Sequence, residues 1–293
     1  MVDDSGAFAF PRTIIRKGIG LETPNYGSSC KVKLKIFSQD DTVSHTSEKD
    51  FVIGEGDNEF SETLDKCLEC MHTKEVCVIP YKKENGNLEF ASFSDGNLWC
   101  EIELLSFLKA KDPWHTTAEE KLTVAKHHKA KGTDCFKASN WLAASRRYSH
   151  ALKQLILIGD KLPDNTKDEF EQLRVSCLLN LAACQGKLEQ FEFVAENCTK
   201  VLAMSPTNLK ALFRRGQAFV CLNEYEKAKD DLEKVWRASR KYQSPSSPAF
   251  TLAPCNSAVQ EQLRILKQKQ RLHDEKLSKA LSAMFGRRKT SLE

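Results

Sequence analysis

The chain has 293 residues, of which 41% are hydrophobic and 29% charged, a composition typical of globular proteins that bury sizeable cores. Its 44 basic and 40 acidic residues leave a formal charge of +4, which is too small to indicate a nucleic-acid partner. No apolar stretch approaches the roughly 18 residues of a membrane span, and the first residues lack the pattern of a secretory signal. We therefore expect two domains, no membrane partner, and a location in the cytosol, with the nucleus as a second compartment.

Eleven cysteines are scattered along the chain. Without an export signal we interpret them as free thiols rather than as a disulfide framework. Cys67 and Cys70 form a Cys-x-x-Cys pair, which would suit half of a zinc site or a redox motif, but a second pair at metal-ligand spacing is missing. We interpret both thiols as lying on or near the buried face of a short helix, and we expect no metal and no cofactor.

Residues 12–107 alternate with a period of two, which is typical of half-buried strands. In CKVKLKIF, residues 30–37, cysteine and aliphatic side chains alternate with three lysines. Turn signals separate the later strands. Those strands are predicted at residues 75–81, 88–93 and 98–107. With one helix near residues 60–71, residues 1–112 should form an antiparallel sheet with a single helix.

The pattern changes after Pro113, where Thr116-Thr117-Ala118-Glu119 has the form of a capping box at the start of a helix. The remaining sequence is helical in pattern except for a Pro- and Ser-rich stretch at residues 243–254. We therefore expect three repeat units within residues 117–242. A basic C-terminal helix should follow at residues 257–288.

Three helical units share small and larger residues at the same spacings of 12, 4 and 3 positions. The sets are Gly132, Ala144, Tyr148 and Ala151; Ala182, Val194, Cys198 and Val201; and Gly216, Ala228, Leu232 and Val235. Val194 and Ala228 lie 34 positions apart, which is the tetratricopeptide period. Ala144 and Val194 lie 50 apart, so we expect 16 extra residues, around LPDNTKDEF, in the connection between the first two units. The repeats are predicted at about 125–158, 175–208 and 209–242, and an unrelated helical bundle is the alternative.

Stacked repeats present the first helix of each pair along a concave groove. The predicted first helices carry Lys129, Asn180, Lys210 and Arg214. Lys and Arg donate charge-assisted hydrogen bonds to carboxylates, and Asn can hold a terminal backbone. The set therefore predicts a clamp for a peptide that ends in carboxylates. The alternative for each cation alone is a solvated surface charge.

These four residues, with TLDKCLECM, LWCEIELLSF and NLKALFRRGQA, resemble the FKBP-type immunophilins that carry tetratricopeptide repeats, over residues 8–286. The resemblance implies an α+β fold: a degenerate FKBP-like antiparallel β domain followed by an all-α repeat superhelix with a C-terminal helix. The family often has a second Asn in the clamp, where this chain has Thr133. The resemblance also implies a co-chaperone that binds the acidic C-terminal tail of heat-shock protein 90, with heat-shock protein 70 as the alternative, and links it to client proteins.

The resemblance further indicates that the first domain has lost prolyl isomerase activity. Leu64 lies where active members have a Trp pocket floor, and no Phe-Asp follows residues 31–37. The segment at residues 79–90, IPYKKENGNLEF, is too short for the loop that covers the substrate. Without walls that exclude water, a twisted prolyl amide gains little stabilisation over its ground state.

Two other functions stay open at this point. One is a prolyl isomerase with an unusual pocket. The other is a signalling adaptor whose last helix binds calmodulin or a membrane, because nine Lys or Arg and only two acids lie between Arg264 and Lys289. We favour the simpler interpretation that this helix covers the end of the repeat array through Val259, Leu263 and Leu266, which follow helical spacing.

Overall fold

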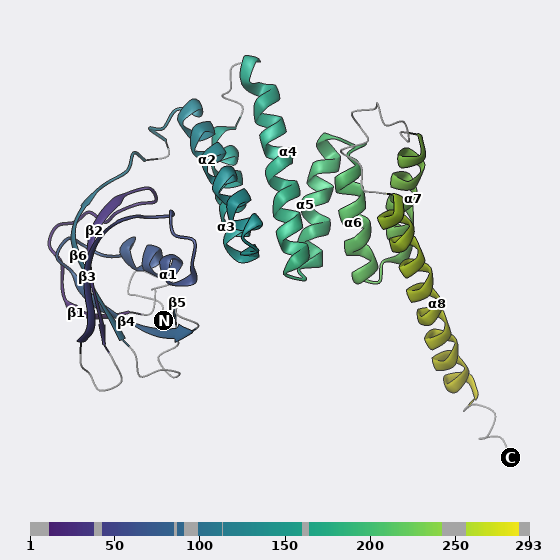
Figure 1. Cartoon of the computed structure of the whole chain (residues 1–293), viewed down its shortest axis with the longest axis horizontal. Helices are drawn as coiled ribbons and strands as arrows, with labels where there is room; N and C mark the ends of the chain where they lie inside the picture. The colour runs from purple at the N-terminus through teal and green to yellow at the C-terminus, as the bar shows by residue number, and fades with distance from the viewer. Residues whose placement is uncertain are drawn as a thin grey trace. The chain divides into compact units, whose positions relative to one another are not determined.

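The computed structural model describes residues 12–37, 43–84, 87–90, 99–112, 114–159, 164–241 and 256–286. The chain divides into two compact units, Met1–Thr117 and Ala118–Glu293. The first unit is a sheet with one helix, and the second is a row of helices (Figure 1). The predicted fold class, an antiparallel β domain followed by an all-α repeat array with a C-terminal helix, is confirmed.

The sheet has six strands, and every pairing between them is antiparallel. They are β1 (Thr13–Arg16), β2 (Ser29–Phe37), β3 (Val43–Val52), β4 (Val76–Glu84), β5 (Asn87–Phe90) and β6 (Trp99–Leu108). The order is β1-β4-β6-β2-β3, and β5 pairs with β4. The predicted strands appear as β2, β4, β5 and β6, although residues 91–93 of the predicted third strand lie outside the described residues. Strands β1 and β3 were not predicted because their described side chains are mostly exposed, so no apolar alternation identifies them.

Helix α1 (Glu59–Leu68) packs against one face of this sheet. It begins at the N-cap residue Asn58, whose side-chain oxygen accepts a hydrogen bond from Ser61 N at 2.7 Å. The buried core combines helix and strand residues. Its members include Leu64, Leu68, Val32, Ile79, Ile102 and Leu104. The strands present ion pairs on their more exposed positions, such as Lys35 with Glu101 at 2.6 Å, which is the alternation that the sequence predicts.

The two cysteines of the Cys-x-x-Cys motif lie in different environments, one in the core and one on the surface. Cys67 is fully buried, with its Sγ 3.3 Å from Cys77 Sγ and 3.7 Å from Met71 Sδ. Cys70 is exposed because α1 ends at Leu68, so the prediction that both thiols lie on the buried face is wrong for Cys70. The ten cysteines in the described residues are free thiols. Within the same residues no group of three or more His, Cys, Asp or Glu side chains could hold a metal ion.

The second unit contains the helices that build the repeats. They are α2 (Ala118–Lys137), α3 (Trp141–Ile158), α4 (Asp164–Lys187), α5 (Phe191–Met204), α6 (Leu209–Cys221), α7 (Tyr225–Lys241) and α8 (Asn256–Gly286). Successive helices contact one another, and α4 also contacts both α2 and α6. Small residues permit this packing: a Cβ at Gly132 would lie 3.0 Å from the Tyr148 ring, and one at Gly216 would lie 2.9 Å from Leu232 Cγ.

Two features of the first repeats differ from the sequence predictions. The extra residues before the second repeat do not simply lengthen a loop, because residues from Asp164 onward are helical and α4 has 24 residues against 13 in α6. Leu173, in the added turns, packs in one buried cluster with Leu155 of α3, and this contact stabilises the turns as helix. The start of the helix also differs from the predicted capping box. Helix α2 begins at Ala118, and Thr116 Oγ1 donates to the Asp112 carbonyl oxygen at 3.1 Å instead of accepting from the helix.

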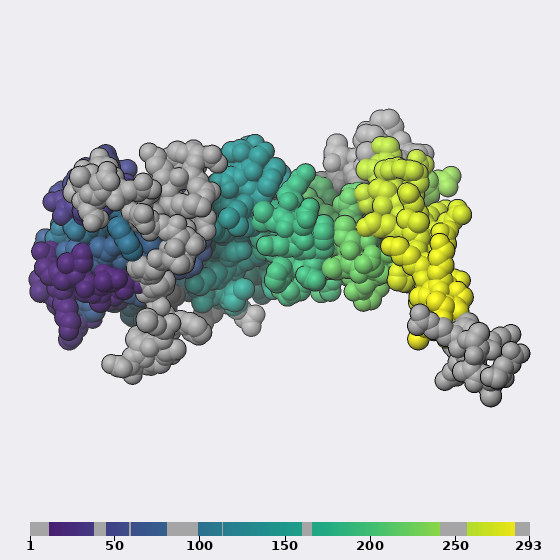
Figure 2. All heavy atoms as spheres, turned by 90° about the horizontal axis from the view of Figure 1, so that it is seen from below, coloured from purple at the N-terminus to yellow at the C-terminus, as the bar shows by residue number. Residues whose placement is uncertain are grey.

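Helix α8 covers the third repeat through its N-terminal half. Val259 and Leu266 are buried against apolar residues of α6 and α7, and Leu263 packs beside them, as predicted. Further along, Leu277 and Met284 are 51% and 71% exposed, and Figure 2 shows the yellow C-terminal half of α8 projecting beyond the array. None of the described helices is long and apolar enough to cross a membrane. A partner for the projecting half stays a prediction.

Two matched Leu→Ala variants on α8 test this packing. Leu266→Ala should lower the free energy of unfolding of the full chain by about 2–5 kcal/mol, because a fully buried side chain is replaced by a cavity. Leu277→Ala should change it by less than about 0.5 kcal/mol, because that side chain is half exposed. Thermal unfolding followed by circular dichroism measures both, and equal midpoints for the two variants would contradict the packing.

Candidate functional site

The predicted clamp residues lie on the first helices of the three pairs. Lys129 and Thr133 belong to α2, Asn180 to α4, and Lys210 and Arg214 to α6. Residues four positions apart lie on one face of a helix, one turn from each other. On α6 the side chain of the N-cap residue Asn208 accepts a hydrogen bond from the backbone N–H of the third helical residue at 3.0 Å, so the helix begins just before its two clamp residues.

Two adjoining hollows line this side of the array. The first has a volume of about 690 Å³ and is bordered by Lys129 and Thr133, and the second has about 810 Å³ and is bordered by Asn180, Lys210 and Arg214. Both hollows share two residues of α4, namely Gln172 and Ser176. We refer to the two hollows together as the groove. The structure thus brings all five predicted residues to one groove.

Arg214 is a partly buried guanidinium in the second hollow. Its Nη1 donates to the carbonyl oxygen of Leu179 at 2.6 Å, and burial lowers its pKa. The buried thiols of Cys198 and Cys184 act on its charge, and burial raises their own pKa values to about 12 and about 11. These thiols are therefore neutral at physiological pH. Among the described residues no carboxylate pairs with Arg214, so its charge is desolvated without a counter-ion.

The adjacent arginine has a different environment. Arg215 donates from Nε and Nη2 to the two carboxylate oxygens of Asp231 at 2.7 and 2.9 Å, and from Nη1 to Thr199 Oγ1 at 3.0 Å. The hydrogen bonds to Asp231 raise the pKa of Arg215. This bidentate pair connects α6 to α7. One arginine therefore braces the repeat, while Arg214 faces the groove.

The two lysines of the clamp are also available to a ligand. In the part of the chain that the structure describes, neither Lys129, which is half-buried, nor Lys210, which is exposed, forms an ion pair. By contrast, Lys126 in the first hollow pairs with Glu169 at 2.7 Å and so joins α2 to α4. The groove thus presents lysine charges that no described carboxylate neutralises.

One neutral clamp residue contacts a tyrosine of the same helix pair. Thr133 Oγ1 donates to the Lys129 carbonyl oxygen at 3.0 Å and lies 3.2 Å from the Tyr148 hydroxyl. This contact joins α2 to α3 beside the first hollow.

The sequence analysis missed Gln172 and Ser176, the two residues that border both hollows. They precede Asn180 by eight and four positions, so all three follow one face of α4. That spacing could have identified them. Gln172 was overlooked because it falls in the segment interpreted as an insertion, ahead of the repeat predicted to start at residue 175.

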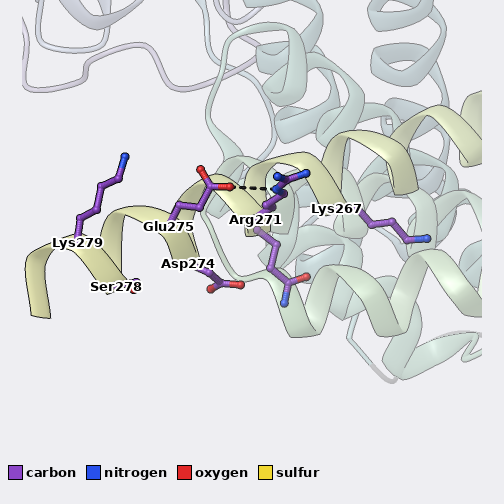
Figure 3. Close-up of a pocket in the computed structure, with 7 residues that line it drawn as sticks. Lys267, Arg271, Asp274, Glu275, Ser278 and Lys279 are labelled. Carbon is purple, nitrogen blue, oxygen red and sulfur yellow. Dashed lines mark hydrogen bonds and ion pairs between the residues drawn. The ribbon is translucent and has the colours of Figure 1, made fainter. Parts of the chain in front are cut away.

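Another hollow, of about 580 Å³, lies along α8, and all seven residues that line it belong to that helix (Figure 3). Arg271 pairs with Glu275 at 3.0 Å one turn away, and side chains of both charges follow along the helix. No second element contributes a side chain to this hollow. We interpret it as a solvated helix face and assign no site to it.

In the first domain, the residue expected at the floor of an isomerase pocket is a core residue. Leu64 is 2% exposed and belongs to the cluster between α1 and the sheet. The segment expected to be too short for a covering loop forms the β4–β5 hairpin, in which Tyr81 pairs with Phe90 and Glu84 with Asn87. Only two positions, 85 and 86, lie between the two paired strands in the sequence.

The different roles of Arg214 and Arg215 should appear in the free energy of unfolding when each arginine is replaced. Arg215→Met should lower the free energy of unfolding by about 3–5 kcal/mol, because it leaves the buried Asp231 carboxylate unpaired. Arg214→Met should change it by less than about 1 kcal/mol, because no described carboxylate loses a partner and a desolvated charge is removed. Urea unfolding of the full-length variants checks both values. A loss for Arg214→Met as large as that for Arg215→Met would show that Arg214 is also a structural brace.

Comparisons with known proteins identify the family. Human FK506-binding protein-like is 31% identical over 281 residues, which are 95% of this chain and 71% of that protein. Bovine peptidyl-prolyl cis-trans isomerase FKBP4 is 31% identical over 282 residues, which are 94% of this chain but 58% of that protein. The crystal structure of residues 1–211 of CG17282 superposes with a TM-score of 0.50 at 18% identity, over 62% of this chain and 90% of that one. No family model matches the chain. The chain belongs to the FKBP-type immunophilins and carries a tetratricopeptide-repeat array.

Proposed function

We propose that this protein is a co-chaperone whose repeat groove binds the acidic C-terminal tail of heat-shock protein 90, with heat-shock protein 70 as the alternative chaperone, and links it to client proteins. One observation carries the proposal: Arg214 is a desolvated cation without a described carboxylate partner, and it shares a hollow with Asn180 and Lys210. An incoming carboxylate would supply the missing counter-ion and satisfy the donors that face the groove.

The groove suits a short peptide with several carboxylates. Lys210 is exposed and can attract the acidic tail, whereas Arg214 can form the more desolvated contact. Lys129 supplies a further cation in the adjoining hollow. Apolar Val175 and Leu179 border the second hollow and offer a surface for an aliphatic side chain. A tail ending in Glu-Glu-Val-Asp combines these chemical features.

The clamp predicts a specific loss of affinity. Lys210→Ala or Arg214→Ala should each weaken binding of a Glu-Glu-Val-Asp peptide by roughly tenfold or more, because a charge-assisted contact contributes about 1.5–3 kcal/mol. Lys200→Ala is the matched control, since Lys200 lies on α5 and pairs with Glu196 at 2.8 Å. Isothermal titration calorimetry with the full chain measures the affinities. Wild-type affinity in both groove variants would show that the peptide binds elsewhere or not at all.

We further propose that the N-terminal domain does not isomerise prolyl bonds. The bovine relative is named as a peptidyl-prolyl cis-trans isomerase. In this chain Leu64 is buried within the core, and β4 and β5 pair with only two positions between them in the sequence. These features support a domain without the apolar, water-excluding pocket that would stabilise a twisted prolyl amide.

An isomerisation assay tests this second proposal. Uncatalysed cis-trans exchange of a prolyl peptide takes tens to hundreds of seconds at 25 °C, so a weak catalyst is readily detected above it. We expect the observed rate to stay at the uncatalysed value at every concentration of the full chain, with an active isomerase as the positive control. A rate that rises in proportion to protein concentration would overturn the proposal.

A further inference from the structure

Three sulfur atoms meet in the core of the first unit. Cys67 Sγ lies 3.3 Å from Cys77 Sγ, and Met71 Sδ lies 3.7 Å from each of them. All three side chains are fully buried. A thioether has no proton to donate, so two thiol protons serve three sulfur–sulfur contacts. A soft cation at the centre would contact all three sulfurs at once.

The three sulfurs are carried by segments whose backbone is held in place. Cys67 lies on α1, and its carbonyl oxygen accepts from Arg12 Nη1 at 3.1 Å. Just beyond the helix, the backbone N–H of Met71 donates to the Leu68 carbonyl oxygen at 3.0 Å. Cys77 lies on β4, which pairs at this position with β1 on one side and β6 on the other. Such rigid elements hold a set of ligands in a fixed geometry.

The triangle has the size and the chemistry of a metal site. Its centre lies roughly 2.1 Å from each sulfur, within about 0.2 Å of a metal–thiolate bond length. Thiolate and thioether ligands together select Cu(I). Zinc prefers four ligands at tetrahedral positions, and the described residues contain no group of three His, Cys, Asp or Glu side chains that could hold a metal ion.

We propose that Cys67, Met71 and Cys77 bind one Cu(I) ion through two thiolates and one thioether. Binding replaces the two thiol protons, which pass to the solvent, and no electron is transferred because the ion enters as Cu(I). Buried apolar neighbours in the same cluster, such as Leu68 and Ile79, exclude water from the ion. The site belongs to the first unit and does not depend on the function proposed for the groove.

The sequence analysis expected no metal because it searched for a second cysteine pair at zinc spacing. Met71 was interpreted only as an apolar residue. Cys77 lies ten positions after Cys67, on a strand and not on the helix, so only the packing of α1 against the sheet brings the two thiols together.

Competition for Cu(I) tests the site. The full chain, reduced and kept free of oxygen, is titrated with Cu(I) against the chromophoric chelator bicinchoninate. Met71→Leu keeps a similar apolar volume but removes the thioether, so it should weaken binding at least about tenfold. Cys70→Ser is the matched control and should leave the affinity unchanged, because that thiol is exposed and outside the triangle. Equal affinities for Met71→Leu and the wild type would overturn the inference.

X-ray absorption at the copper edge identifies the ligands in the wild type, and so decides the matter even where a variant folds poorly. The bound ion should have three sulfur neighbours and no nitrogen or oxygen neighbour. Nitrogen or oxygen ligands would place the ion on the surface and overturn the inference.

Thermal unfolding provides a third readout, because an ion that binds only the folded chain raises the unfolding midpoint. One equivalent of Cu(I) should raise the midpoint of the wild type and of Cys70→Ser, and should raise that of Met71→Leu by less. Zn(II) should raise none of them. An equal rise with Zn(II) would contradict the assignment of the site to Cu(I).

Discussion

The close approach of paired helices is the constraint on which the rest of the second unit depends. Small residues such as Gly132 and Gly216 leave no room for a Cβ beside the facing helix, so each pair packs as one block. Stacking the blocks brings α2 and α6 to either side of α4. As a result Lys129 and Arg214, which are 85 positions apart in sequence, border adjoining hollows. The groove is therefore a product of the repeat, not of any local motif.

Charge distribution then decides which side chains the groove offers. Arg215 forms an ion pair with Asp231 that joins α6 to α7, and Lys126 forms one with Glu169 that joins α2 to α4. Arg214 lies among protonated thiols and a carbonyl oxygen instead. A partly buried cation without a counter-ion costs stability unless a ligand supplies one. This difference between neighbouring cations is the physical basis for placing an anionic peptide in the groove.

Periodicity predicted most of the architecture. Alternation identified β2 and β6, and the 34-residue period identified the helix pairs, because both patterns record which side chains are buried. Strand β3 was not predicted because its described side chains are largely exposed, and the first turns of α4 were interpreted as a longer connection because they carry polar residues. Matching repeat positions identified the clamp candidates that the groove contains. The contact of the Tyr148 hydroxyl with Thr133 was not predicted, because it depends on how α2 and α3 pack.

The central claim is that the groove recognises a terminal carboxylate. Its most direct test compares two peptides that end in Glu-Glu-Val-Asp and differ only in a free C-terminal acid or a C-terminal amide, titrated calorimetrically into the full chain. The account predicts at least about tenfold weaker binding of the amide, because one charge-assisted contact of about 1.5–3 kcal/mol is lost while the side-chain carboxylates stay. Equal affinities for the acid and the amide would contradict a carboxylate clamp in this groove.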